Sequence, residues 1–213
     1  MNFKNWFENK EEEPIIFLDL DETLVSTQQI PFDENYEEEM IKFGGVLIEE
    51  SYISFLRPHA IDFVNNLKAV AKVCIMTAGG SVFQKKVIKA LNIPIDENNV
   101  FGRRDYQFLA PEKNELPKSK KSILVDDLDP TAGNTMEKLY ALGINEDKHI
   151  KVKPFNFDIF SSKSLPRIFK NDTELLDIQP IVISTLNGTI WKTVYTKNTF
   201  TTWMTNYTML IAV

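Results

Sequence analysis

Two aspartates separated by one residue, Asp19 and Asp21, directly follow an apolar run, Ile15–Leu18. Such a run is typical of a strand buried in a parallel sheet, and the acids would then lie at the carboxyl edge, where open α/β folds bind ligands. Two carboxylates there repel each other and lose hydration unless a cation neutralises them. The spacing therefore indicates a Mg²⁺ site, in which an aspartate can also attack phosphorus as a nucleophile.

A second predicted strand, Val73–Met76, ends at a hydroxyl residue, Thr77, which is followed by Ala78-Gly79-Gly80. A hydroxyl beside exposed backbone N–H groups can form a cradle for phosphate oxygens. Taken alone, such a tetrapeptide is more often only a turn. Its place at the end of a strand makes it a candidate phosphate site.

A third predicted strand, Ser122–Val125, ends in two further acids, Asp126 and Asp127. A lone Asp-Asp pair is more often a solvated strand end or a helix cap. As the second acidic strand end in one α/β chain, this pair is expected to complete the Mg²⁺ site opposite Asp19 and Asp21.

Phosphoryl transfer at such a site also needs a positive side chain that offsets the charge of the nucleophile and the phosphate. The candidates are Lys113, Lys118, Lys120 and Lys121. Most lysines lie on the surface, so composition alone does not choose among these four.

The rest of the pattern alternates strands and helices. A fourth strand is predicted at His149–Val152, and helical spacing of apolar residues predicts helices at Ala60–Ala71, Ser81–Leu91 and Thr131–Leu142. In the last of these helices the apolar positions are Met136, Leu139, Tyr140 and Leu142. The alternation predicts a Rossmann-like α/β fold, a parallel sheet with helices on both faces.

Two segments depart from this alternation. Met40–Leu56 is predicted to be an antiparallel hairpin that turns at Gly44-Gly45. A second hairpin is predicted at Asn187-Gly188, between Ile181–Leu186 and Thr189–Tyr195. We therefore expect an N-terminal extension over residues 1–13, one domain over 14–183 and a β-type tail over 184–213.

Composition limits the classes of function. A chain of 213 residues suits one domain with a sizeable core, and a net charge of −6 argues against broad, charge-driven binding of nucleic acid. The single cysteine, Cys74, lies in an apolar run and is expected to be buried. A lone cysteine fits a reducing compartment, so we expect a cytoplasmic protein, or a nuclear one in a eukaryote. No apolar stretch is long enough to span a bilayer.

Several segments together resemble a known family. Asp19–Val25, with the sequence Asp-Leu-Asp-Glu-Thr-Leu-Val, resembles the first motif of the haloacid dehalogenase-like (HAD) superfamily. It is most similar to the form of this motif in the small C-terminal-domain phosphatases and their NLI-interacting-factor-like relatives. Phe55–His59 is similar to the Arg-Pro segment of that branch, and Asn171–Ile178 resembles its Asp-Thr-Glu-Leu helix. The resemblance runs from about Ile15 to Ile183 and implies a short hairpin insert with no large cap domain.

The resemblance also implies roles. Asp19 would be the nucleophile and Asp21 the general acid/base, and Thr77 would bind phosphoryl oxygens. Asp127 would ligate Mg²⁺, while Asp126 would pair with the motif lysine, which we place at Lys113. Further substrate-binding positions are Thr23, Ala78, Gly79 and Arg57. One departure is that Gly79 stands where the family usually has serine.

These roles predict a Mg²⁺-dependent phosphatase whose partner is a phosphorylated macromolecule. An open site favours phosphoserine or phosphothreonine in proteins. The enzymatic alternative is a terminal phosphate of a nucleic acid or a nucleotide, for which Arg103, Arg104, Lys118, Lys120 and Lys121 would form a basic rim, although a solvated loop is the preferred interpretation of those residues. The second alternative is a binding module without catalysis. All four aspartates are present, which favours activity.

Overall fold

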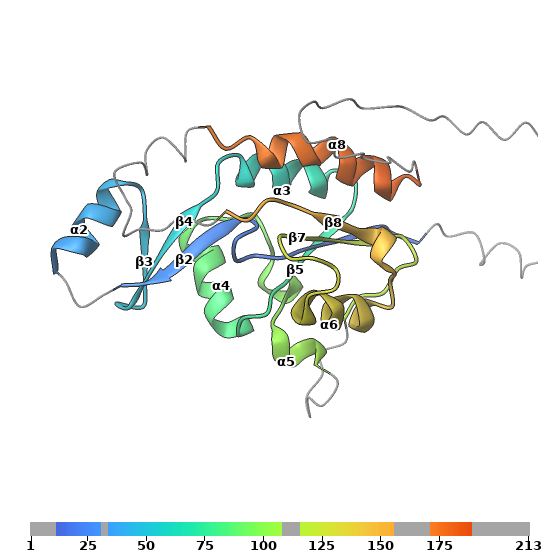
Figure 1. Ribbon diagram of the computed structural model, residues 1–213, viewed down its shortest axis with the longest axis horizontal. Helices are drawn as coiled ribbons and strands as arrows, with labels where there is room; N and C mark the ends of the chain where they lie inside the picture. Colours follow the sequence, from blue (N-terminus) through green and yellow to red (C-terminus); the bar gives the residue numbers. More distant parts are fainter. Residues whose placement is uncertain (1–11, 31–33, 108–115, 156–170, 189–213) are drawn as a thin grey trace, which may run out of the picture.

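The computed structural model describes residues 12–30, 34–107, 116–155 and 171–188. Within them a parallel sheet has the strand order β6-β5-β1-β7-β8 (Figure 1). The strands are β1 (Ile15–Leu18), β5 (Lys72–Met76), β6 (Val100–Phe101), β7 (Ser122–Asp126) and β8 (His149–Lys151). The four predicted strands are confirmed. β6 was not predicted, because two residues carry no periodic signal.

Helices cover both faces of this sheet, as the sequence predicted. Ile16 and Leu18 belong to a core formed with α3 (Ala60–Lys68), α4 (Ser81–Ala90) and α8 (Glu174–Leu186). Ile15 and Phe17 belong to a second core, on the other face, with α5 (Arg103–Tyr106) and α6 (Gly133–Leu142). Figure 1 shows α3 and α8 side by side over one face and α6 under the other. Burial on both faces explains the unbroken apolar run of β1. Two short 3₁₀ turns, Glu97–Asn99 and Glu146–Lys148, precede β6 and β8.

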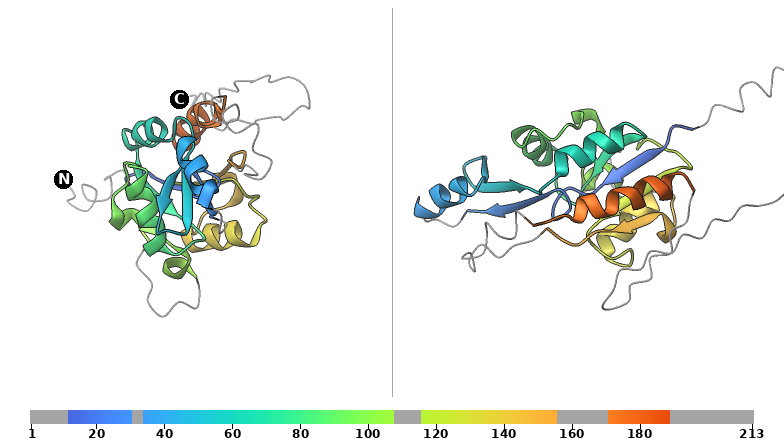
Figure 2. Two further views of the ribbon diagram at one scale, coloured as in Figure 1. Left: turned by 90° about the vertical axis from the view of Figure 1, so that its left-hand side faces the viewer. Right: turned by 90° about the horizontal axis from the view of Figure 1, so that it is seen from above.

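An insert follows the first acidic motif. It contains β2 (Val25–Gln29), α2 (Glu34–Lys42), β3 (Val46–Ile48) and β4 (Tyr52–Leu56), and its strands form an antiparallel sheet in the order β2-β4-β3. Figure 2 shows this small sheet extending beyond one end of the parallel sheet. The insert therefore stands at the carboxyl edge, next to the predicted site.

The predicted hairpin at Met40–Leu56 is wrong in its first half. Met40 lies in α2 and is buried at 1% exposure, and Gly44, with φ 91°, ends that helix. The hairpin is formed by β3 and β4, and it turns at Glu49 and Glu50, whose φ values are 51° and 52°. Because a left-handed glycine serves a helix end as readily as a hairpin turn, the Gly-Gly pair was ambiguous.

The predicted hairpin after Pro180 is also wrong where the structure describes it. Ile181–Leu186 forms the second half of α8, whose buried residues recur at helical spacing: Leu175, Ile178, Val182 and Leu186. Asn187 and Gly188, with φ 76° at the glycine, end the helix. Thr189–Tyr195 and the rest of the expected β-type tail lie outside the described residues. Across the described chain, no helix combines the length and apolar character needed to cross a membrane.

The orientation of α6 differs from the predicted apolar stripe. Met136 and Tyr140 are 57% and 75% exposed, whereas Thr135, Lys138 and Leu139 are buried. The helix is rotated so that a lysine faces the sheet. The reason for this rotation lies in the contacts that Lys138 makes.

Candidate active site

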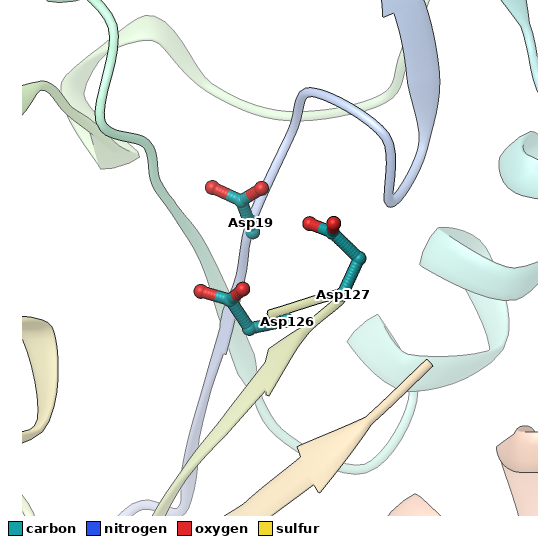
Figure 3. A group of neighbouring side chains, drawn as sticks. All are labelled: Asp19, Asp126 and Asp127. Atoms are coloured by element: carbon teal, nitrogen blue, oxygen red, sulfur yellow. The ribbon is translucent and has the colours of Figure 1, made fainter. Parts of the chain in front are cut away.

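The acidic residues meet because their strands are neighbours. β1 pairs with β7 in parallel register, and the backbone N–H of Asp19 donates to the carbonyl of Val125 at 2.8 Å. Both strands end at the same edge, so Asp19 comes to lie beside Asp126 and Asp127 (Figure 3). The predicted convergence of the two acidic strand ends is thus what the structure shows.

Three carboxylates form a compact group. One oxygen each from Asp19, Asp126 and Asp127 lies within 4.8 Å of the others, and all three residues are buried. Burial, with a contribution from Asp126, raises the pKa of Asp19 to about 7 although Lys138 opposes the shift. Burial and Asp126 likewise raise the pKa of Asp127 to about 6. Ionising these buried carboxylates together is therefore unfavourable unless a cation lies beside them.

A lysine partly balances this group. Lys138 Nζ donates at 2.7 Å to both Asp19 Oδ1 and Asp126 Oδ2, and Lys138 is 1% exposed. Burial lowers the pKa of Lys138, but Asp19 and Asp126 outweigh it and hold that pKa above its usual range. With every group ionised, three carboxylates and one ammonium leave a net charge of two negative units, which one divalent cation would balance.

Lys138 was missed by the sequence analysis. Lys113, the predicted partner of Asp126, lies outside the described residues, and Lys118, Lys120 and Lys121 are exposed on the segment that leads into the amino end of β7. The available signal was that Lys138 occupies the same helical face as Thr135, Leu139 and Leu142. A lysine on a core-facing stripe needs a buried acid as its partner.

Asp21 lies outside the three-carboxylate group and contacts the end of β5, which borders β1 on the side opposite β7. Its Oδ2 accepts a hydrogen bond of 2.6 Å from Gln84 Nε2 and a longer one, 3.5 Å, from Thr77 Oγ1. Burial raises the pKa of Asp21, and the hydrogen bonds from Gln84 and Thr77 oppose that rise. The structure therefore brings Asp21 and Thr77 together, as predicted, and adds Gln84, which the sequence analysis did not select.

Thr77 is buried at the end of β5, the other neighbour of β1. Its Oγ1 accepts a hydrogen bond of 3.1 Å from the backbone N–H of Gly79. Ala78 and Gly79 thus form a turn next to Thr77, but the Gly79 N–H, which the cradle prediction expected to be exposed, is hydrogen-bonded to Thr77. Tyr106 and Phe101 support this turn, through a hydrogen bond from the tyrosine hydroxyl to the Thr77 carbonyl and one from the Thr77 N–H to the Phe101 carbonyl.

Arg57 has a position different from the predicted substrate contact. It is 2% exposed, its Nε and Nη2 donate to Asp172, and its Nη1 donates to the carbonyls of Thr23 and Lys153. Thr23 itself is fully buried. Arg57 therefore joins the insert to the start of α8 and supports the loop that carries Asp21. The Arg-Pro segment and the Asp-Thr-Glu-Leu segment, which each resemble the family in sequence, are thus in contact through Arg57 and Asp172.

The basic rim is not assembled around the acidic group. Lys120 and Lys121, together with Lys148, line a cavity of about 410 Å³ at the amino ends of β1 and β7. This is the edge opposite Asp19. Arg103 and Arg104 do lie at the carboxyl edge, after β6, but Arg103 pairs with Glu137 at 3.4 Å.

Fold and site together define an α/β protein with an acidic centre of the HAD type at the carboxyl edge of its sheet. A family model described as NLI interacting factor-like phosphatase matches residues 14–193. The chain belongs to this family. A protein of Invertebrate iridescent virus 3, described as a CTD phosphatase-like protein, 355R, is 30% identical over 180 residues, covering 78% of this chain and 92% of the viral protein.

Two solved structures of Fcp1 are among the chains to which this chain is similar. One, described as an essential RNA polymerase II CTD phosphatase, has a TM-score of 0.48 at 18% identity and covers 86% of this chain. Another, fission yeast Fcp1 bound to beryllium fluoride, has a TM-score of 0.46 at 18% identity and covers 87% of this chain. The chain spans 53% of the length of each of these two solved chains.

Proposed function

We propose that this protein is a Mg²⁺-dependent phosphatase that hydrolyses phosphomonoesters through an aspartyl-phosphate on Asp19. Its preferred substrates are phosphoserine and phosphothreonine in proteins. The observation that carries the proposal is the placement of Asp19, which belongs to the three-carboxylate group and contacts Lys138, two residues before Asp21, which accepts from Thr77. A nucleophile, a charge-balancing lysine and an acid/base group are thus gathered at one strand end.

The proposed reaction has two steps, formation of the aspartyl-phosphate and its hydrolysis. Lys138 holds one oxygen of Asp19, and the other attacks phosphorus as the bond from phosphorus to the ester oxygen breaks. Asp21 gives its proton to the departing oxygen. Asp21 then takes a proton from the water that attacks the phosphoryl group on Asp19. That attack releases inorganic phosphate and regenerates both acids.

The residues present fit a magnesium ion. Mg²⁺ binds carboxylate oxygens, and three buried carboxylates with one buried lysine gather net negative charge at this edge. Asp19 and Asp127 would hold the ion, while Asp126, whose two oxygens accept hydrogen bonds from Lys138 and from the Leu128 N–H, would hold Lys138 in place. The bound ion would supply charge neutralisation for the phosphoryl group.

The substrate class rests on the family and on the surface near the site. The viral relative is described as a CTD phosphatase-like protein, which favours a phosphorylated protein. Three apolar side chains are exposed on segments that follow the carboxyl edge: Val82 in α4, Leu128 in the loop after β7 and Met136 in α6. Such side chains suit a peptide better than a nucleic-acid end, and the net charge of −6 agrees.

The test is hydrolysis of p-nitrophenyl phosphate with Mg²⁺ or with EDTA, by the wild type, Asp19→Asn and the surface control Asp62→Asn. We expect turnover that needs Mg²⁺, is abolished by Asp19→Asn and is unchanged by Asp62→Asn. Near-wild-type activity of Asp19→Asn would disprove the assignment of the nucleophile. Parallel panels of phosphopeptides and of 3′- or 5′-phosphorylated oligonucleotides then decide the substrate class, with the phosphopeptides expected to be turned over faster.

A further inference from the structure

Gln84 is a buried side chain in direct contact with the proposed general acid/base. It lies one turn into α4, is 3% exposed, and its Nε2 donates to Asp21 Oδ2 at 2.6 Å. The bond from Thr77 to the same oxygen is 3.5 Å long, so Gln84 makes the closer contact. Its other polar atom, Oε1, is buried and has no hydrogen-bond partner among the described residues. An amide that leaves one atom unpaired in a core is a poor choice for stability alone, which points to a functional role.

Gly79 makes room for this glutamine. A Cβ atom built on Gly79 would overlap Gln84 Nε2, and its next neighbours would be the Cδ and Cγ of the same side chain at 3.3 Å. Any larger residue at position 79 would therefore push the amide away from Asp21. Gly79 is the position at which the chain departs from the Thr-Ala-Ser pattern of the family that it resembles. The position of the Gln84 amide therefore depends on the absence of a side chain at Gly79.

We propose that Gln84 is a positioning residue that holds the Asp21 carboxyl group in the orientation required for proton transfer to the leaving oxygen, and that Gly79 is small in order to admit it. The proposal rests on the proposed phosphatase function. Proton transfer requires the acid within hydrogen-bonding reach of the departing oxygen, and a carboxyl group that rotates freely spends less time in that geometry. Gln84 acts through Asp21 and has no contact of its own with the reacting atoms.

The leaving group provides a specific test. The alkoxide that leaves phosphoserine is far more basic than p-nitrophenolate, so it depends much more on protonation by Asp21. We expect Gln84→Leu to lower kcat/KM for a phosphoserine peptide by about tenfold or more, and that for p-nitrophenyl phosphate by less than about threefold. The matched control is Gln179→Leu on the distant helix α8, which removes the hydrogen bond that Asn66 of α3 donates and should change neither value.

A double-mutant cycle tests the dependence of Gln84 on Gly79. Gly79→Ala alone should cause the same selective loss on the phosphoserine peptide, because the new methyl group displaces Gln84. In the Gln84→Leu background, Gly79→Ala should add little further loss, so the two effects will not be additive. Loss of the exchange protection of the Gln84 side-chain amide, measured by NMR on metal-free Gly79→Ala, gives a readout independent of activity.

The outcomes separate the two proposals. Equal losses on both substrates in Gln84→Leu, or additive effects in the cycle, would overturn the positioning role while leaving the phosphatase proposal intact. A wild type with no turnover of either substrate would overturn the proposed function, and the role of Gln84 would fall with it. Selective and non-additive losses support both.

Discussion

Replacing Lys138 with methionine tests the charge balance of the acidic centre. Methionine keeps an unbranched, apolar stem in the helix but removes the ammonium that contacts Asp19 and Asp126 at 2.7 Å each. Removing one partner from a buried ionic group costs about 3–5 kcal/mol, because the remaining charge has no compensation. Lys138 is 1% exposed and has two partners, so we expect the upper part of this range in the metal-free protein at pH 8.

Urea unfolding measures this loss. For a chain of this length each kcal/mol lowers the melting temperature by about 2–4 °C, so thermal melts should show the effect as well. Mg²⁺ should stabilise Lys138→Met more than the wild type, because the added cation offsets the missing ammonium. Adding Asp126→Asn to Lys138→Met should recover part of the loss, since it removes one of the uncompensated charges.

The matched control is Lys151→Met. Lys151 contacts Asp129 at 2.5 Å, but both side chains are about half exposed or more, at 49% and 63%. An exposed pair contributes little to stability, because solvent and salt screen it. If Lys138→Met lost no more free energy of unfolding than Lys151→Met, the reasoning from burial would be refuted. An Asp126→Asn substitution that failed to recover any stability would contradict the role of that carboxylate.

Two further predictions follow from buried acids and from close backbone approach. In the folded metal-free protein Asp19 and Asp127 have pKa values of about 7 and 6, above the ordinary carboxyl value of 3.8. Protonation of these two carboxyl groups therefore stabilises the folded state fully below about pH 4, and this stabilisation is lost as pH rises to about 7. Asp127→Asn should therefore raise the free energy of unfolding more at pH 8 than at pH 4 in urea titrations; an equal effect at both would contradict the shift. A Cβ at Gly102 would overlap the Ser81 backbone nitrogen, so Gly102→Ala should cost about 1–3 kcal/mol in thermal melts. Gly133→Ala, which meets nothing within 4 Å, should cost nothing or stabilise slightly.

The elements that the sequence predicted well are those with local signals. The apolar run of β1 and the helical spacing in α3 and α4 are properties of consecutive residues, so they could be recognised without knowledge of the fold. The errors arose where one local signal serves two structures. Gly44 ends a helix and was interpreted as a hairpin turn, and Asn187-Gly188 ends α8 but was likewise interpreted as a turn between strands.

The sequence by itself determined that Asp19, Asp21, Thr77 and the Asp126-Asp127 pair would lie at one edge of the sheet, because parallel strands present their carboxyl ends there. Only the tertiary structure decided which side chains complete that centre. Lys138 reaches Asp19 across 119 positions of sequence, Arg57 reaches Asp172 across 115, and Gln84 reaches Asp21 across 63. Lysine, arginine and glutamine are usually surface residues, and no local spacing marks one of them as buried. Their burial depends on how α6, α8 and α4 pack on the sheet, since a buried charge or amide is stable only where a partner from another element faces it.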